Sequence, residues 1–390
     1  MAGMALILLA IGYFIGYAFI DNPIFGLVIA LIVWGILSLV AFFQGDSILL
    51  GLSKAKKIKK EDYPRLYNVV EEMKIASGLE HMPEIYIIDD PALNAFATGR
   101  NPEKASVAIT SGLLERLNRD ELQGVIAHEI SHIKNRDVLL MSVAGIMLGT
   151  IVILGWYVSR ILIFGGMGRS RRSSNGGGQG QAIILIVGLV FMILAPIMAQ
   201  FLYFAISRKR EYLADASGAL YTRYPEGLAS ALEKLGSSKT GVKDANKATA
   251  PMYIVNPFTV KTMKAHDLTS THPPLSDRIR ILRAMGGGAS LANYEDAYKK
   301  VHGGRGHMIP AGALATAGAV GLRGPSEEPG VGSEIAQRKQ QRREVSNVLE
   351  NMNGYRTVDC ECGARWKVPN SFRDDKVLCT RCGRTLDVRR

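Results

Sequence analysis

The sequence predicts a multi-pass α-helical membrane protein that carries a mainly α (α+β) polar domain and a small C-terminal module held by cysteines. The chain has 390 residues, of which 47% are hydrophobic and 21% are charged, and its formal net charge is +12. This composition excludes a disordered protein, because disorder combines low hydrophobicity with high net charge. Two patterns then decide the class: the apolar residues gather in four uncharged blocks, and all four cysteines lie near the C-terminal end.

The four apolar blocks predict four transmembrane helices. They contain no Asp, Glu, Lys or Arg and cover residues 4–20, 24–43, 138–159 and 182–206. Roughly 17 to 25 apolar residues are enough to cross a hydrocarbon core of about 30 Å as a helix. Buried helices of a soluble domain are the alternative, but they seldom run so long without a charge. Only Asp21, Asn22 and Pro23 separate the first two blocks, which indicates a membrane hairpin rather than a signal peptide.

Basic residues orient the predicted helices. Five lysines between residues 54 and 60 follow the second block, and Arg208, Lys209 and Arg210 follow the fourth. Because basic residues concentrate on the cytoplasmic side of a membrane, we expect both of these ends in the cytoplasm. The expected location is the cell (inner) membrane, multi-pass, with the polar domain facing the cytoplasm. Arginines in the Gly/Ser-rich loop at 165–181 oppose this orientation, because they would lie outside.

The remaining sequence divides around these blocks. We expect a transmembrane hairpin at 1–43, a polar domain at 44–302 interrupted by a second hairpin at 138–206, a linker and charged helix at 303–354, and the cysteine module at 355–390. In the polar domain, β-branched runs at 84–88 and 105–110 predict strands, and helical periodicity at 64–76 and 119–134 predicts helices. A stretch rich in Gly, Ala and Pro after residue 303 predicts the linker.

A His-Glu-x-x-His motif lies in the second predicted helix of the polar domain. On a helix, His128 and His132 are one turn apart and face the same way, so that both imidazoles can bind a single Zn²⁺. Glu129 lies beside them and can hold and deprotonate a water molecule, which is the general-base role in a metalloprotease. A chance match on an ordinary helix is the alternative, expected in roughly one chain in a hundred of this size.

A third ligand is expected on another helix, because a catalytic zinc has three protein ligands and one open position. The segment after the fourth apolar block supplies candidates, since Glu211 and Asp215 lie one helical turn apart. Glu211 would bind the metal, and Asp215 would accept a hydrogen bond from a ligand imidazole. The alternative is a solvated charged helix that follows a membrane exit. Two predicted crossings return the chain to the same side of the membrane as His132, which favours the metal site.

These motifs resemble those of the HtpX-type membrane zinc metalloproteases, which are relatives of the CAAX prenyl proteases. The resemblance rests on residues 92–99, 107–114, 121–137, 211–216 and 271–279 and covers roughly residues 1–285. It implies a gluzincin metalloprotease domain, with His128, His132 and Glu211 as zinc ligands, Glu129 as the catalytic base and Asp215 as a supporting residue. It also implies that His272 stabilises the oxyanion of the reaction, although a histidine held at a helix start by two prolines is the alternative.

The same resemblance implies that one segment is an edge strand along which an extended substrate lies, with recognition through its backbone. The residues of this segment are Asn94, Ala95, Phe96, Ala97 and Thr98.

The cysteines predict a second, structural zinc in a zinc-ribbon-like module. They form two close pairs, Cys360 with Cys362 and Cys379 with Cys382, and four thiolates fill a tetrahedral zinc. Disulfides are the alternative, but a module that follows a cytoplasmic domain is expected to be reduced. Acidic residues interrupt the basic ones around the cysteines, which argues against nucleic acid and favours a protein partner for this module.

The expected function is therefore that of a membrane-bound zinc endopeptidase, which hydrolyses peptide bonds at the cytoplasmic face of the membrane in membrane-protein quality control. Its expected partners are the lipid bilayer and unfolded or membrane protein substrates. A prenyl-protein (CAAX-type) protease would share the zinc core, but nothing in the sequence marks a chamber for a prenyl group. A non-enzymatic membrane adaptor would use the zinc only structurally, and the intact Glu129 argues against it.

Overall fold

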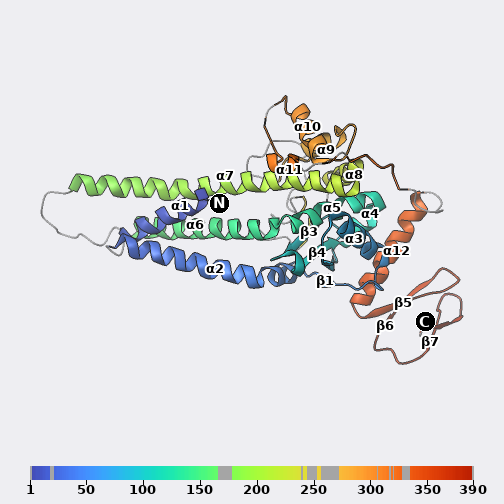
Figure 1. Ribbon diagram of the computed structural model, residues 1–390. Helices are drawn as coiled ribbons and strands as arrows, with labels where there is room; N and C mark the ends of the chain where they lie inside the picture. Colours follow the sequence, from blue (N-terminus) through green and yellow to red (C-terminus); the bar gives the residue numbers. More distant parts are fainter. Residues whose placement is uncertain are drawn as a thin grey trace.

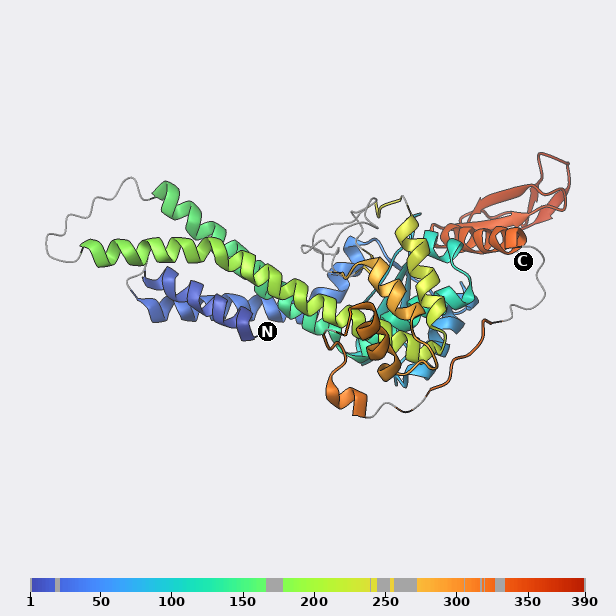
Figure 2. The ribbon, with the colours of Figure 1, turned by 90° about the horizontal axis from the view of Figure 1, so that it is seen from above.

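The structure is a computed structural model. It describes residues 2–17, 22–165, 178–238, 240–243, 253–255, 272–304, 306–315, 318, 320–326 and 334–388. Long helices run side by side at one end of the elongated molecule, the polar domain follows them, and the cysteine module lies at the far end (Figures 1 and 2). The basic loop between the third and fourth predicted membrane helices lies outside the described residues at 166–177.

The four apolar blocks all lie in helices: α1 (Ala2–Ile15), α2 (Pro23–Leu52), α6 (Asp137–Gly165) and α7 (Gly178–Thr222). In the described part of the chain, two windows are long and apolar enough to cross a membrane, Pro23–Val40 and Asp137–Leu154, whereas α1 is shorter. The count of four crossings therefore remains a prediction. Two of the helices extend past their apolar blocks into the polar domain, since α2 ends only at Leu52 and α7 continues through Pro196 to Thr222.

Small residues bring α1 and α2 together. A Cβ atom on Gly26 would lie only 2.4 Å from the backbone of Gly16, so only glycine fits where the two helices meet. Close contact through small residues is typical of helix pairs in membranes. Asn22 caps α2 by accepting a hydrogen bond from the backbone N–H of Phe25 at 3.1 Å, and Pro23 occupies the first helical turn. The second helix of the hairpin predicted at 1–43 therefore begins at a defined capping residue.

A four-stranded sheet forms one layer of the polar domain. Its strands are β1 (Lys56–Lys57), β2 (Glu84–Ile88), β3 (Ala95–Gly99) and β4 (Ala105–Thr110), in the order β1-β2-β4-β3. Strands β2 and β4 are parallel, and β3 is antiparallel to β4 with Ala97 opposite Val107. The strands predicted at 84–88 and 105–110 are confirmed. Because β3 ends the sheet, one of its edges faces the helices that carry the candidate site.

Helices cover the sheet and surround α5 (Arg119–Lys134), the central helix of the domain. Of its 16 residues, 13 are buried, and it packs against α3 (Pro64–Ser77), α7, α8 (Pro225–Ser237) and β3. Asn118 and Glu121 form a reciprocal capping box at its start. The helices predicted at 64–76 and 119–134 are confirmed. Three further helices complete this region: α4 (Ser111–Arg116), α9 (Leu275–Arg283) and α10 (Leu291–Val301).

The described part of the expected linker contacts the polar domain closely. After the short helix α11 (Ala311–Ala315), the segment at 320–326 crosses the start of α5, where Arg323 and Ser326 bind Asp120. Helix α12 (Glu334–Met352) then packs on the domain and buries Val345 and Val348 in its main hydrophobic core. The Gly, Ala and Pro content predicts a linker and carries no signal for these long-range contacts.

The cysteine module consists of two antiparallel hairpins. The first pairs β5 (Tyr355–Asp359) with β6 (Arg365–Pro369), and the second pairs β7 (Lys376–Leu378) with β8 (Thr385–Asp387). Each hairpin contributes one pair of cysteines near its turn.

Candidate active site

His128 and His132 lie one turn apart on the buried central helix α5. His128 is fully buried, and the Nε2 atoms of the two imidazoles are 3.2 Å apart. Glu211 reaches the same point from α7, with its Oε1 atom 3.4 Å from Nε2 of His132 and its Oε2 atom 3.8 Å from Nε2 of His128. Ligand atoms about 2.0–2.1 Å from a tetrahedral zinc lie about 3.3–3.4 Å from one another. The separations of these three groups therefore fit one metal ion.

Each histidine has a carboxylate on the other side of its ring. Nδ1 of His128 lies 3.0 Å from Oδ1 of Asp215, and Nδ1 of His132 lies 2.9 Å from Oδ2 of Asp137. A carboxylate at Nδ1 holds the proton on that nitrogen and leaves Nε2 free to bind a metal. Arg210 forms an ion pair with the other oxygen of Asp137. Both ligand rings are thus oriented from helices α6 and α7.

Glu129 points into the same space. Its side chain is buried, and its Oε1 atom has no hydrogen-bond partner among the described residues. A buried polar atom without a protein partner marks a place for a missing ligand or water molecule. The backbone N–H of Ala97 in β3 donates to this carboxylate. Glu129 therefore lies between the metal-ligand cluster and the edge strand.

Burial and charge set the protonation of the cluster. Burial lowers the pKa of His128 to about 4, which keeps its imidazole neutral and able to bind a metal. Burial also raises the pKa of Glu129 to about 7, the range in which a carboxylate exchanges protons readily at neutral pH. Burial alone would raise the pKa of Glu211, but its interactions with His272, Arg278 and His132 outweigh burial and hold that pKa well below the ordinary value.

His272 and the predicted substrate segment both lie next to the cluster. Nδ1 of His272 is 3.1 Å from Oε2 of Glu211. The segment predicted at 94–98 forms β3 at the edge of the sheet, with Asn94 just before the strand. The outer side of β3 is partly covered, since the backbone N–H of Ile254 donates to the carbonyl oxygen of Ala95 at 3.0 Å. Ala97, two residues further along this edge, lines a hollow beside Glu129.

Known proteins match this chain over more than half of its length. The model of peptidase family M48 matches residues 60–286. The protease HtpX homologs of Dictyoglomus turgidum and Dictyoglomus thermophilum are 49% and 50% identical to this chain over 261 and 262 residues, which is 67% of this chain and 82% of each relative. That of Thermoanaerobacter pseudethanolicus is 45% identical over 281 residues, which is 72% of this chain and 91% of the relative.

This chain belongs to peptidase family M48. It is a membrane-bound metalloprotease, and the resemblance found in its sequence is confirmed. A solved crystal structure, that of S. mikatae Ste24p, matches with a TM-score of 0.42 and 22% identity, over 72% of this chain and 62% of that chain. The family match ends before α12 and the cysteine module of this M48 peptidase.

Two further residues contact the side chains of the candidate site, and no local sequence pattern predicts either contact. Asp137 follows His132 by five residues, and its contact with that imidazole depends on the turn between α5 and α6, where Arg136 has a positive φ of 55°. Arg278 lies in α9 and is fully buried. It donates to both oxygens of Asp215 at 2.7 and 2.8 Å and to Oε2 of Glu211 at 3.1 Å. Its sequence signal is its place in the motif at 271–279, six residues after His272.

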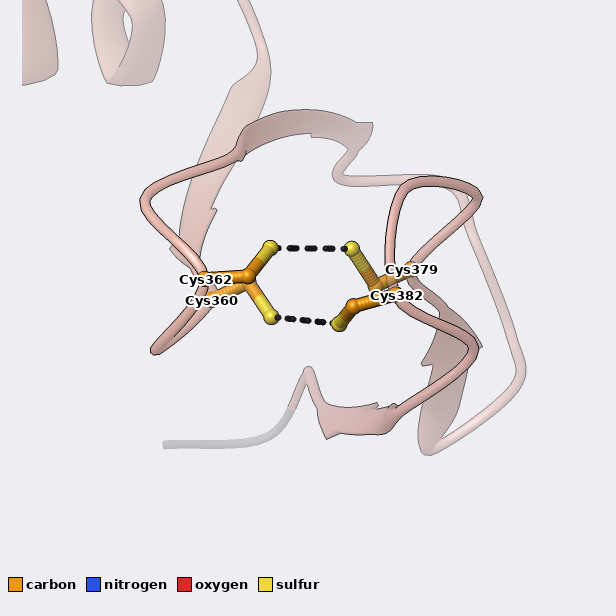
Figure 3. A group of neighbouring side chains, drawn as sticks. All are labelled: Cys360, Cys362, Cys379 and Cys382. Carbon is orange, nitrogen blue, oxygen red and sulfur yellow. Dashed lines mark hydrogen bonds between the residues drawn. The ribbon is translucent and has the colours of Figure 1, made fainter.

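The four cysteines of the M48 peptidase also converge (Figure 3). The sulfurs of Cys360 and Cys382 are 3.5 Å apart, those of Cys362 and Cys379 are 3.7 Å apart, and all four lie within 4.8 Å of one another. These separations exclude disulfides between the pairs, and they fit four sulfurs about 2.3 Å from a tetrahedral zinc, which lie about 3.8 Å apart. Burial would raise the pKa of Cys379, but backbone N–H groups of Arg381 and Cys382 outweigh it and lower that pKa to about 6.

Proposed function

We propose that this M48 peptidase hydrolyses peptide bonds with a catalytic zinc held by His128, His132 and Glu211. The observation that carries the proposal is the meeting of these three side chains beside a buried Glu129 whose Oε1 atom has no partner in the described chain. Zinc, when bound, supplies Lewis-acid polarisation of the scissile carbonyl. Asp215 and Asp137 hold the two imidazoles in the tautomer that presents Nε2.

Glu129 acts as the general base and then as the general acid. Its carboxylate takes a proton from the attacking water and passes it to the nitrogen of the leaving amine. His272, next to Glu211, stabilises the negative charge that develops on the carbonyl oxygen. The substrate backbone lies along the outer edge of β3 next to Ala97 and Thr98, whereas Asn94, Ala95 and Phe96 carry the contacts that position this edge.

We also infer the setting of this reaction. The chain crosses the membrane four times through α1, α2, α6 and α7, and the lysines that follow α2 favour a cytoplasmic polar domain in the cell membrane. Its substrates are unfolded or membrane proteins, because the site lies where α6 and α7 enter the polar domain. Hydrolysis at this place suits the quality control of membrane proteins.

The cysteine module holds a second, structural zinc through Cys360, Cys362, Cys379 and Cys382. Four thiolates leave no open position for a substrate, so this metal stabilises the module rather than taking part in hydrolysis. Acidic and basic side chains alternate on its surface, for example in the ion pairs Arg365–Asp359 and Arg384–Glu361. This mixed surface suits a protein partner better than nucleic acid.

A pair of substitutions tests the catalytic roles. Glu129→Gln should abolish hydrolysis of unfolded casein by the full-length protein in detergent while the catalytic zinc stays bound, because it removes the base and no ligand. Glu211→Ala should lose both the activity and that zinc. Glu103→Gln, an exposed carboxylate away from the cluster, is the matched control. Near-normal turnover by the Glu129→Gln variant would contradict the assignment.

A further inference from the structure

A hollow of about 410 Å³, part of it open to solvent, lies directly beside the candidate metal site. Glu129, His132 and Glu211 form one side of it. Its other walls are Ala97 of β3, Val138 and Met141 of α6, and Ser207 of α7, with the Asp137–Arg210 ion pair completing the lining. We name this hollow the seam pocket, because α6 and α7 leave the polar domain here.

The walls of the seam pocket belong to two different hydrophobic cores of the described chain. Val138 packs against the core of the polar domain, and Met141 packs against the core formed between the membrane helices. Both residues lie in the first two turns of the apolar window Asp137–Leu154, one of the two candidate membrane spans among the described residues. The pocket is therefore at the level where the polar domain meets the membrane.

The chemistry of the seam pocket favours an apolar occupant. Val138, Met141 and Ala97 offer alkyl groups, and Ser207 is small. Arg210 is the basic residue of the lining, and its charge is already paired with Asp137, which in turn contacts His132. An acidic side chain in the pocket would have to compete with that pair. A medium-sized apolar side chain would bury its surface without breaking any of these contacts.

A second hollow continues from the seam pocket along the edge strand. Its space of about 270 Å³ is partly open to solvent, and it shares Val138 with the seam pocket. It reaches Phe42 and Leu49 of α2 and the residues Thr98, Gly99 and Arg100 at the end of β3. The end of β3 therefore lies beside the C-terminal part of α2 and the N-terminal turns of α6. A peptide extended along β3 from Ala97 would run toward the membrane helices, with alternate side chains about 6.8 Å apart on the same face.

We propose that the seam pocket is a specificity pocket, which receives a leucine, methionine or phenylalanine side chain next to the scissile bond. This inference rests on the proposed function. It names the preferred substrate as an extended, apolar segment directly beside a transmembrane helix of the target protein. The membrane helices α6 and α7 then act as part of the substrate-binding site as well as an anchor, through Val138, Met141 and Ser207.

The test is a cleavage-site profile of the full-length, zinc-loaded protein in detergent, with reduced, unfolded casein as the probe. Mass spectrometry of the products gives the residues on each side of every cut. We expect leucine, methionine and phenylalanine to be enriched at one position next to the cut. Met141→Trp should fill the pocket and shift that position toward alanine and glycine by at least about tenfold, since one methylene in an apolar pocket changes selectivity by about 10- to 200-fold.

Met141→Ala enlarges the pocket and should admit tyrosine and tryptophan at the same position. Ser207→Leu narrows the same pocket from the side of α7. It is measured in place of Met141→Trp if the tryptophan variant does not fold. Ile153→Trp is the matched control, because Ile153 lies on the same helix with 62% of its surface exposed, away from the pocket. Its profile should equal that of the unmodified protein.

The outcomes separate this proposal from the proposed function. Cleavage that persists after removal of zinc or in the Glu129→Gln variant overturns the proposed catalytic roles of the zinc and of Glu129. Zinc-dependent cleavage with a profile that none of the pocket substitutions moves overturns the seam pocket alone. A preference for aspartate or glutamate at the position next to the cut would also overturn the proposed apolar pocket, because Arg210 would then bind the acidic side chain of the substrate.

Discussion

Arg278 donates from Nε and Nη2 to the two carboxylate oxygens of Asp215, at 2.8 and 2.7 Å, and both side chains are fully buried. The same guanidinium reaches Glu211, and Asp215 contacts the ring of His128. One buried cation thus holds a candidate zinc ligand together with the carboxylate that orients another. Arg278 stabilises both buried carboxylates, because a buried charge is stable only when it is paired and hydrogen-bonded.

Arg278→Lys should weaken zinc binding and hydrolysis by about 10- to 100-fold. Lysine keeps the charge but cannot make the planar pair of hydrogen bonds to Asp215, so the imidazole of His128 loses its fixed orientation. Zinc affinity is measured by competition with a chelator, and turnover is measured on unfolded casein. Arg278→Met should in addition lower the free energy of unfolding by about 3–5 kcal/mol, because it removes the cation that two buried carboxylates share.

Arg283→Lys is the matched control for this substitution. Arg283 lies on the same helix α9, but it pairs with Glu226 and Glu233 at the surface, where ion pairs contribute about 0–1 kcal/mol. An Arg278→Lys protein with unchanged zinc affinity would mean that Asp215 holds His128 without the help of the guanidinium.

Helical periodicity explains why much of the site could be predicted from the sequence. The period of one helix is enough to predict that His128 and His132 face the same way. The β-branched residues at 84–88 and 105–110 predict the two strands found there. Strand β3 reads Ala-Phe-Ala-Thr-Gly, which has weak strand propensity, and it was found only through a family resemblance. Asp137 and Arg278 act through contacts between elements distant in sequence or across a turn, and no local pattern encodes such contacts.

His272→Ala should slow hydrolysis by about 10² to 10³ while the zinc content stays at the level of the unmodified protein. Nδ1 of His272 contacts Glu211, so the imidazole is held beside the place where the carbonyl oxygen acquires charge. Metal analysis and turnover are measured on the same preparation. His272→Gln keeps a hydrogen-bond donor and should recover part of the rate. A loss of zinc equal to the loss of activity would instead make His272 a support for Glu211.

Asp120→Asn should destabilise the protein at neutral pH by about 1.5–3 kcal/mol, the range for hydrogen bonds to a charged group. Asp120 accepts hydrogen bonds from the backbone N–H and hydroxyl of Ser326 and from Arg323. Burial would raise its pKa, but these donors outweigh burial and lower it. The stabilisation is therefore complete above the ordinary carboxyl pKa of about 3.9 and is lost as the pH falls through the lowered pKa.

Thermal unfolding of the detergent-solubilised protein between pH 7 and pH 3 checks this prediction. The difference in Tm between the unmodified protein and Asp120→Asn should shrink as the pH falls. Asp296→Asn, at an exposed position of α10, should leave the Tm unchanged at every pH. A Tm difference that grows toward acid pH would contradict the prediction that the ionised carboxylate of Asp120 stabilises the protein.

The last prediction concerns where the cysteine module can be removed without damage to the protease. Helix α12 belongs to the polar domain in packing, because Val345 and Val348 are buried in the main core and Lys56 donates to the side chain of Asn353 at 2.6 Å. A chain that ends at Gly354 keeps these contacts and loses only the two hairpins. It should bind one zinc in place of two, and it should still hydrolyse a short peptide.

A chain that ends near Gly330 also loses α12. It exposes the core residues against which Val345 and Val348 pack. Burial of a valine contributes about 1.5–3 kcal/mol, so this shorter chain should unfold at a clearly lower temperature. Full-length protein with Cys360→Ser and Cys362→Ser is the control that removes the second zinc and keeps the backbone. Two zinc ions in the chain that ends at Gly354 would refute the cysteine site. A folded chain of that length with one zinc but no peptidase activity would mean that the module helps to build the active site.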